Sequence, residues 1–319
     1  MSGFTITGGV SFSGAVSMSD APPPPENTAG WFGGGAYPFF SSVDRITYAT
    51  DTATASVRGP LSSARRYLAA VGNFTNGWFG GGYNPSFAAA VSRVDRITYA
   101  TDTDTASVRG PLSSARYNLA AAGNTTDGWF GGGETPGVSR VDRITYATDT
   151  ATASVRGPLS TAKYELTAAG NSDYGWFVGG YQTSVGFLST VDRITYATDT
   201  ATASVRGPLS ATRYQLAAAG NSDYGWFGAG KNGTAGGFST VNRITYATDT
   251  ATASVRGPLS SARYFLAAAG NTTDGWFAGG RASTSLVDRI TYATDTATAS
   301  VRGPLSAARY QFAAAGGIQ

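Results

Sequence analysis

The stretch Gly128-Trp-Phe-Gly-Gly-Gly133, followed after a short connection by Arg143-Ile-Thr-Tyr-Ala-Thr-Asp-Thr150, decides the fold, because Gly-Trp-Phe and the second segment each recur six times in the 319 residues. The tryptophans stand at positions 31, 78, 129, 176, 226 and 276, so the repeat is 47 to 51 residues long by subtraction. This period is typical of propeller blades or solenoid turns. Trp129 and Phe130 are adjacent and must point to opposite faces of a strand, so both faces must be buried, as when blade packs on blade.

One repeat predicts four short strands. They are expected at Tyr117 to Gly123, Gly128 to Gly133, Val141 to Ala147 and Thr152 to Arg156, and the last ends at Gly157-Pro158, a pair that cannot continue a ladder. The first strand is rich in alanine, which suits the innermost position, because strands that converge on an axis leave room only for small side chains. Each repeat is therefore expected to form one blade with its alanine strand at the centre.

The two ends of the repeat region complete each other. The chain enters the ring at Gly30 with a second strand, and its last segment, Tyr310 to Gly316, is a first strand that lacks its blade. Pairing of the two would remove the exposed edges of an open sheet. We therefore predict an all-β, six-bladed propeller of four-stranded blades over residues 30–319, closed by the C-terminal strand.

The order of elements resembles the kelch repeat. The resemblance rests on Gly132-Gly133, Tyr146, Thr150 and Arg116 and their counterparts from Gly30 to Gly316, although Ala153 stands where kelch blades usually carry a fourth-strand Trp. It implies a propeller of a class made up mostly of binding platforms, with some enzymes. The near-identical repeats behind a short Gly/Ser-rich leader also resemble repeat proteins of phage virions, especially marine ones.

Composition excludes several kinds of chemistry. The chain has no Cys and no His, which excludes disulfides, thiol nucleophiles, imidazole metal ligands and His-based acid–base catalysis, along with the ligands that the copper oxidases of this fold require. We expect no metal and no cofactor. The net charge of +3 is too small and too evenly spread to indicate nucleic acid or an anionic membrane as partner. We also expect no secretory signal and no membrane span, and localisation stays open, with a virion suspected.

The copies differ most between their second and third strands. These connections run from Ala36 to Ser42, Tyr83 to Arg93, Glu134 to Arg140, Tyr181 to Thr190, Lys231 to Thr240 and Arg281 to Leu286, and all six should emerge on one face. Aromatic residues in them are candidate anchors for a protein or glycan. The candidate binding residues here are Tyr37, Phe39, Phe40, Tyr83, Phe87, Glu134, Tyr181, Phe187, Lys231, Phe238 and Arg281. Drift in unconstrained loops is the alternative explanation.

Two further sets lie at the expected inner strand. One position differs between most copies and should lie near the axis: Tyr67, Asn118, Glu165, Gln215, Phe265 and Gln311. Beside it runs a basic set that could ring the channel mouth and bind an anion or acidic peptide: Arg65, Arg116, Lys163, Arg213, Arg263 and Arg309. Solvated charges or ion pairs between blades are the alternative. Residues of the Asp44, Arg45 and Arg58 type repeat with the ring, so we expect them to form structural pairs.

Residues 1–19 alternate around a Gly pair and predict a small hairpin-like tail that docks on a protein partner, followed by a stiff Pro-rich linker over residues 20–29. The leading hypothesis is a non-enzymatic binding propeller, a virion attachment or decoration protein that can assemble into a larger particle. A purely architectural subunit is one alternative. A sialidase-like, glycan-processing enzyme is another, because Asn171-Ser-Asp-Tyr-Gly-Trp176 faintly resembles an Asp-box turn and Glu134 and Glu165 break the symmetry as acids.

Overall fold

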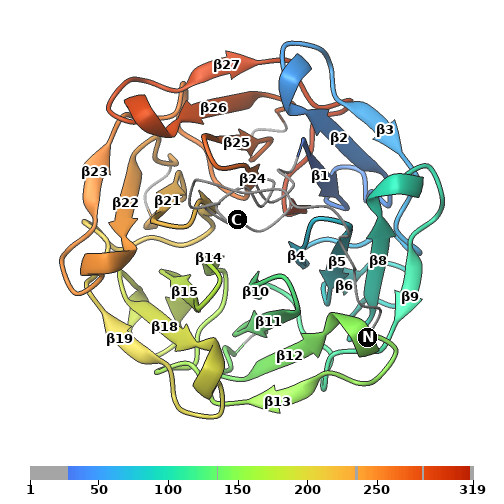
Figure 1. Ribbon diagram of the computed structural model, residues 1–319, viewed down its shortest axis with the longest axis horizontal. Helices are drawn as coiled ribbons and strands as arrows, with labels where there is room; N and C mark the ends of the chain where they lie inside the picture. The colour runs from blue at the N-terminus through green and yellow to red at the C-terminus, as the bar shows by residue number, and fades with distance from the viewer. Residues whose placement is uncertain (1–27, 135, 234–235, 282–283, 317–319) are drawn as a thin grey trace, which may run out of the picture.

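The computed structural model describes residues 28–134, 136–233, 236–281 and 284–316. Within these ranges, six four-stranded antiparallel sheets surround one axis as the blades of a disc (Figure 1). The predicted six-bladed propeller is confirmed. The tail at residues 1–19 and most of the proposed linker lie outside the described residues.

Each blade runs from an inner strand at the axis to an outer strand at the rim (Figure 1). From blade 1 to blade 6 the inner strands are β28 (Ala313–Ala315), β4 (Ala69–Gly72), β10 (Ala120–Gly123), β14 (Thr167–Gly170), β20 (Ala217–Gly220) and β24 (Ala267–Gly270). The second strands are β1 (Ala29–Gly33), β5 (Asn76–Gly80), β11 (Asp127–Gly131), β15 (Tyr174–Val178), β21 (Tyr224–Gly228) and β25 (Asp274–Ala278).

The outer half of each blade is equally regular. The third strands are β2 (Val43–Thr47), β8 (Val94–Thr98), β12 (Val141–Thr145), β18 (Val191–Thr195), β22 (Val241–Thr245) and β26 (Val287–Thr291). The outer strands are β3 (Ser56–Arg58), β9 (Ser107–Arg109), β13 (Ser154–Arg156), β19 (Ser204–Arg206), β23 (Ser254–Arg256) and β27 (Ser300–Arg302). Two of the longer connections add small hairpins, made of β6 (Tyr83–Asn84) with β7 (Ala89–Ala90) and of β16 (Tyr181–Gln182) with β17 (Gly186–Phe187).

Blade 1 is built from both ends of the described chain. Its strand order is β28-β1-β2-β3, and β28 pairs antiparallel with β1 in the register Trp31↔Ala315, Phe32↔Ala314 and Gly33↔Ala313. The predicted closure by the C-terminal strand is therefore confirmed. Alanines fill the inner strands, as the crowding at the axis requires.

The third strand is shorter than expected because its tyrosine leaves the ladder. In every copy the strand ends at Thr, and Tyr begins a 3₁₀ turn: η1 (Tyr48–Thr50), η2 (Tyr99–Thr101), η3 (Tyr146–Thr148), η4 (Tyr196–Thr198), η5 (Tyr246–Thr248) and η6 (Tyr292–Thr294). The turn lays the tyrosine ring on the tryptophan of the preceding blade. Tyr146 stacks on Trp78 with ring centroids 3.8 Å apart and an interplanar angle of 7°.

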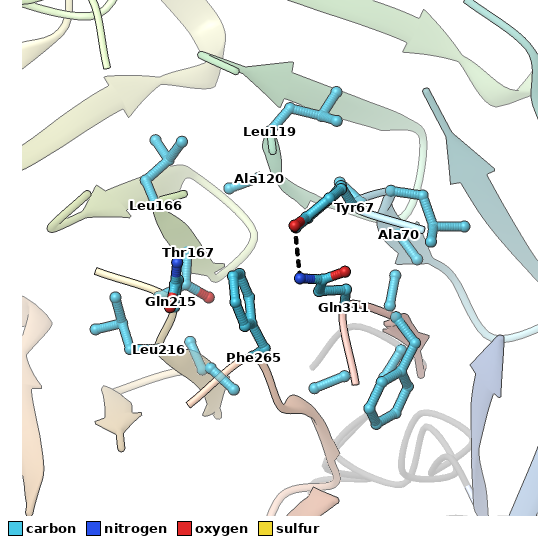
Figure 2. Close-up of a pocket in the computed structure, with 18 of the residues that line it drawn as sticks. Tyr67, Ala70, Leu119, Ala120, Leu166, Thr167, Gln215, Leu216, Phe265 and Gln311 are labelled. Atoms are coloured by element: carbon cyan, nitrogen blue, oxygen red, sulfur yellow. Dashed lines mark hydrogen bonds between the residues drawn. The ribbon is translucent and has the colours of Figure 1, made fainter. Parts of the chain in front are cut away.

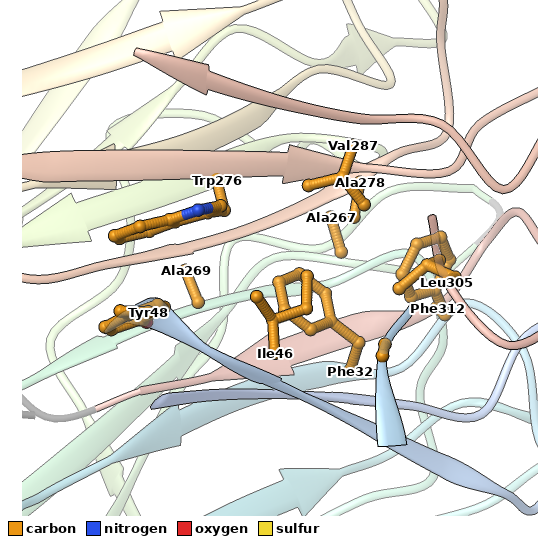
Figure 3. Packing of buried hydrophobic residues seen from close by; sticks show 11 residues of the cluster. Phe32, Ile46, Tyr48, Ala267, Ala269, Trp276, Ala278, Val287, Leu305 and Phe312 are labelled. Carbon is orange, nitrogen blue, oxygen red and sulfur yellow. The ribbon is translucent and has the colours of Figure 1, made fainter. Parts of the chain in front are cut away.

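The core consists of the interfaces between blades. At the interface where the ring closes, Trp276 of blade 6 stacks on Tyr48 of blade 1, beside Phe32 and Ile46 (Figure 3). Such aromatic pairs add about 1 kcal/mol each beyond the area they bury. The same cluster recurs at the other interfaces, so stability comes from blade-to-blade burial.

A buried aspartate also links each blade to the one before it. Asp102 Oδ2 accepts a hydrogen bond from Trp31 Nε1 at 2.9 Å and from Arg45 at 3.0 Å. Arg58 Nε lies 3.6 Å from the same oxygen. In the same way, Asp51 accepts a hydrogen bond from Trp276 and forms ion pairs with Arg289 and Arg302 of blade 6. The expected structural role of the Arg45 and Arg58 positions is confirmed.

No helix in the described ranges is long and apolar enough to cross a membrane.

Candidate functional site

The variable connections share one face with the segments that enter the inner strands. Backbone bridges join the two sets, as in Arg66↔Tyr83, Tyr164↔Tyr181 and Tyr214↔Lys231. We call the described residues of the six variable connections and of these entry segments the variable face. The face surrounds one end of the central axis.

The basic set of the entry segments does not ring the mouth, so that expectation is wrong. Arg65, Arg116, Lys163, Arg213, Arg263 and Arg309 are all at most 3% exposed. Five of them pair with a third-strand aspartate of the same blade, as Arg65 does with Asp95 at 2.8 Å. The alternative interpretation, ion pairs between blades, is correct in that the cations form ion pairs. Each pair, however, lies within one blade.

These buried cations hold the bases of the variable connections. Arg116 donates to the carbonyl oxygens of Gly132 at 2.9 Å and Arg140 at 3.0 Å, the two ends of the connection in blade 3. Asp142 also accepts hydrogen bonds from the backbone N–H and the hydroxyl of Ser113. In blade 5 the aspartate is replaced by Asn242, and burial lowers the pKa of Arg213 to about 10.

The axial mouth is formed by the six variable inner positions, which line a cavity of about 130 Å³. Figure 2 labels four of them, Tyr67, Gln215, Phe265 and Gln311. The six positions do not lie within the inner strands as expected but precede them. All six adopt left-handed backbone angles, with φ between 56° and 61°. In this conformation the backbone N–H of each residue faces the mouth residue of the preceding blade.

The six backbones form a closed ring of hydrogen bonds. Each N–H donates to the carbonyl oxygen of the preceding blade, from Asn118 to Tyr67 at 2.9 Å, and so on until Tyr67 donates to Gln311 at 2.8 Å. Side chains add two further links. Gln311 Nε2 donates to the Tyr67 hydroxyl at 2.6 Å (Figure 2) and Gln215 Nε2 donates to Glu165 Oε2 at 2.8 Å.

Among the residues that the structure describes, Glu165 is the one charged residue that lines this cavity. Burial raises the pKa of Glu165 to about 7, while the hydrogen bond from Gln215 and the positive charge of Lys231 act in the opposite direction. A carboxyl group in this environment changes charge near neutral pH. Glu134, its expected companion, is not among the lining residues; its N–H donates to the Tyr117 carbonyl in the loop after β11.

A second ring, made of five tyrosines and one arginine, was missed by the sequence analysis. Directly after each buried cation comes Arg66, Tyr117, Tyr164, Tyr214, Tyr264 or Tyr310. These side chains are partly buried on the variable face and contact the loop residues. The recurrence of tyrosine in five of six copies could have indicated this ring. Residues that repeat in every copy, however, were assigned to a structural role in the sequence analysis.

Loop residues and this second ring form mixed aromatic and cationic clusters. Arg66 lies 5.0 Å from the ring centres of Phe39 and Tyr67 and 5.2 Å from that of Tyr83. Lys231 lies 4.5 Å from the ring of Tyr264, and Arg281 lies 5.4 Å from that of Tyr310. Such contacts orient the cations while leaving them at the surface.

The remaining predicted aromatics divide into three groups. Tyr37 and Phe87 project from the loops and are 71% and 68% exposed, and Phe39 is 40% exposed. Phe187 stacks on Tyr214 with centroids 5.0 Å apart, next to Tyr181. Phe40 and Phe238 instead cover the buried cations Arg309 and Arg213. The first group presents apolar surface to a partner, and the last pair supports the loops.

The opposite end of the axis has a different character. The cavity there is lined by alanine, glycine and Val71. The two ends of the axis therefore differ in their lining: polar and aromatic side chains line the end at the variable face, and small side chains line the opposite end. In the described ranges, no three His, Cys, Asp or Glu side chains gather as a potential metal site.

Of the comparisons with known proteins, the one with solved structures supports the fold. No family model matches the sequence, and no curated protein matches it. The chain is similar to a solved structure described as "Structure of YjhT", with a TM-score of 0.64 and 11% identity over 79% of this chain and 87% of that one. At this identity the likeness shows a common propeller fold.

Proposed function

We propose that this chain is a non-catalytic binding protein whose variable face binds a protein or a glycan. The observation that carries the proposal is the gathering of aromatic and cationic side chains from different blades around one mouth. Tyr and Phe side chains at a partly exposed surface supply binding energy at low entropic cost, and Tyr and Arg are enriched among the residues that contribute most to binding. Tyr37 and Phe87, at 71% and 68% exposure, leave large apolar groups in solvent until a partner covers them.

The way the loops are held supports the same function. Buried cations fix both ends of the connections, as Arg116 does in blade 3, so the loop bases are rigid while the loop contents differ. A rigid scaffold with differing loops is the common arrangement of binding proteins. Rigid loops also lose less entropy when a partner binds.

The test is binding to glycan arrays and to extracts of the source, with the full chain and two groups of variants. We expect Tyr37→Ser and Phe87→Ser each to weaken binding by about tenfold. Val155→Ser is the matched control, because Val155 is 57% exposed on an outer strand at the rim. Equal affinity of all variants, or no change on exchanging one variable loop for another, would show an architectural subunit instead.

The kelch class and a place in a phage virion are finer parts of this proposal. The kelch assignment is supported by the recurring Gly pair, Tyr and Arg, and the virion assignment by the near-identical repeats behind a Gly/Ser-rich leader. We propose that residues 1–19 dock the disc on a particle. Deleting residues 1–27, which leaves β1 (Ala29–Gly33) intact, should abolish particle association and leave binding by the variable face unchanged; retained association would contradict the docking role.

One observation favours a second candidate, a glycoside-cleaving enzyme. Glu165 lines the axial cavity, and burial raises its pKa to about 7, which suits a general acid. Turnover of sialosides or other glycosides that disappears in Glu165→Gln would support this candidate. Binding without turnover would support the first.

A further inference from the structure

The axial mouth contains polar groups that the fold leaves without partners. The side-chain oxygens Oε1 of Gln215 and Gln311 are buried and accept no hydrogen bond, although both amide nitrogens donate to neighbours. The two residues are 8% and 6% exposed. A buried acceptor without a donor costs about 1–3 kcal/mol, so the oxygens of Gln215 and Gln311 are candidate acceptors for a donor group that enters the cavity from outside.

The backbone donors at the mouth are already used. All six backbone N–H groups of the mouth residues donate within the closed ring. The carboxylate of Glu165 can only accept hydrogen bonds, so the Gln215 amide turns its nitrogen toward Glu165. The amide oxygen of Gln215 then has no donor. An anion would meet a carboxylate and unsatisfied oxygens here, with no free N–H from the ring. The chemistry of the site therefore selects a hydrogen-bond donor.

The charge and shape of the cavity narrow the class of ligand. Glu165 supplies one negative charge when the pH lies above its pKa of about 7, and Tyr67 and Phe265 supply aromatic surface with ring centres 5.7 Å apart. A divalent metal ion prefers several carboxylates, whereas one carboxylate, neutral oxygens and aromatic faces suit a monovalent organic cation. Tyr67, Glu165 and Phe265 are only partly buried, so a narrow ligand can reach them.

We propose that the axial mouth binds a primary ammonium group, held by Glu165, by the free amide oxygens of Gln215 and Gln311, and by the rings of Tyr67 and Phe265. The group could belong to a lysine side chain of a partner, to an amino sugar or to a small free amine. The site uses mouth residues and not the tips of the variable loops, so it does not depend on the proposed function of those loops.

The test uses calorimetric titration of the full chain with n-butylammonium, and with n-butanol and butyrate as neutral and anionic analogues. We expect the ammonium to bind and both analogues to bind at least about tenfold more weakly, as one charge-assisted contact requires. Glu165→Gln should lower the ammonium affinity by about tenfold. Glu134→Gln is the matched control, because Glu134 does not line the cavity, and should leave the affinity unchanged.

Gln215→Met keeps the side-chain length, removes the free oxygen and should weaken binding several-fold, which keeps the test decisive if Glu165→Gln does not fold. A one-lysine peptide, glucosamine and n-butylammonium, compared in the same titration, distinguish the sources of the ammonium. Absence of ammonium binding, equal binding of butyrate or butanol, or full affinity in Glu165→Gln would overturn the proposal. Loss of loop-dependent partner binding in Tyr37→Ser with intact ammonium binding would separate the two functions.

Discussion

The indole nitrogen of Trp276 donates a hydrogen bond to Asp51 Oδ2 over 2.8 Å, although the two residues are 225 positions apart. The same contact joins Trp78 to Asp149 between blades that are neighbours in sequence. The junction between the first and last blades is therefore built like the internal ones.

Replacing Asp51 tests this junction directly. Asp51→Asn removes the charge that faces Arg289 and Arg302 and should lower the free energy of unfolding by about 2 kcal/mol. Asp149→Asn is the internal counterpart and should cost a similar amount in chemical denaturation. If Asp51→Asn left the free energy of unfolding unchanged while Asp149→Asn lowered it, the ring would be an open spiral.

The C-terminal strand should be essential for stability. Removal of residues 310–319 deletes β28 and the buried Phe312, which alone should cost at least about 3 kcal/mol. We expect a large drop in melting temperature by calorimetry. Removing only residues 317–319 is the control and should leave the melting temperature unchanged; equal melting of both truncations contradicts closure.

The glycine before each exit proline should not tolerate a side chain. A Cβ on Gly157 would lie 2.0 Å from the Ala201 carbonyl oxygen in the next blade, and a Cβ on Gly303 would meet Ala53 in the same way. Gly157→Ala should therefore destabilise the protein by about 3 kcal/mol in urea denaturation. Gly236→Ala, where a Cβ has no neighbour within 4 Å, should be neutral.

Blade 5 should gain stability from a single added charge. Arg213 is 2% exposed, and Asn242 stands where the other blades have a paired aspartate. Asn242→Asp should restore the ion pair and raise the free energy of unfolding, on the order of 3 kcal/mol. Thermal melting checks this, and Asp142→Asn in blade 3 should produce the opposite change.

Glu165 should make stability fall as pH rises. Burial raises its pKa from 4.5 to about 7, so the folded chain binds more protons than the unfolded chain between these values. The melting temperature of the wild type relative to Glu165→Gln should therefore decline from about pH 4.5 to 7 and then level off. Lys231 opposes this shift, so Lys231→Met should move the decline to higher pH. A difference that does not depend on pH would contradict the burial of the carboxyl.

The architecture was predictable because its causes are local and repeated. Trp129 beside Phe130 requires two buried faces, Gly157-Pro158 ends a strand, and the unpaired segment from Tyr310 completes the sheet begun at Gly30. Strand ends were less predictable, since Tyr146 leaves the ladder to stack on Trp78 of another blade. That partner lies 68 residues away by subtraction, beyond any pattern within one repeat.

The site was only partly predictable, for a physical reason. Arg116 lies in an irregular segment, where strand alternation says nothing about direction, and its partners include the carbonyls of Gly132 and Arg140. A hydrogen bond to a backbone carbonyl cannot be predicted from the pattern of side chains, because every residue has such a carbonyl. The free oxygens of Gln215 and Gln311 likewise follow from which atoms of each amide are already bonded.

The head-to-tail ring of backbone hydrogen bonds at the mouth limits how this gene can evolve. Near-identical repeats favour unequal recombination, which adds or deletes whole copies. A protein with five or seven copies would change the angle between neighbouring inner strands, and all the hydrogen bonds of the ring would have to adjust their geometry together. A change in one loop affects one blade, whereas a change in copy number affects every bond of the ring.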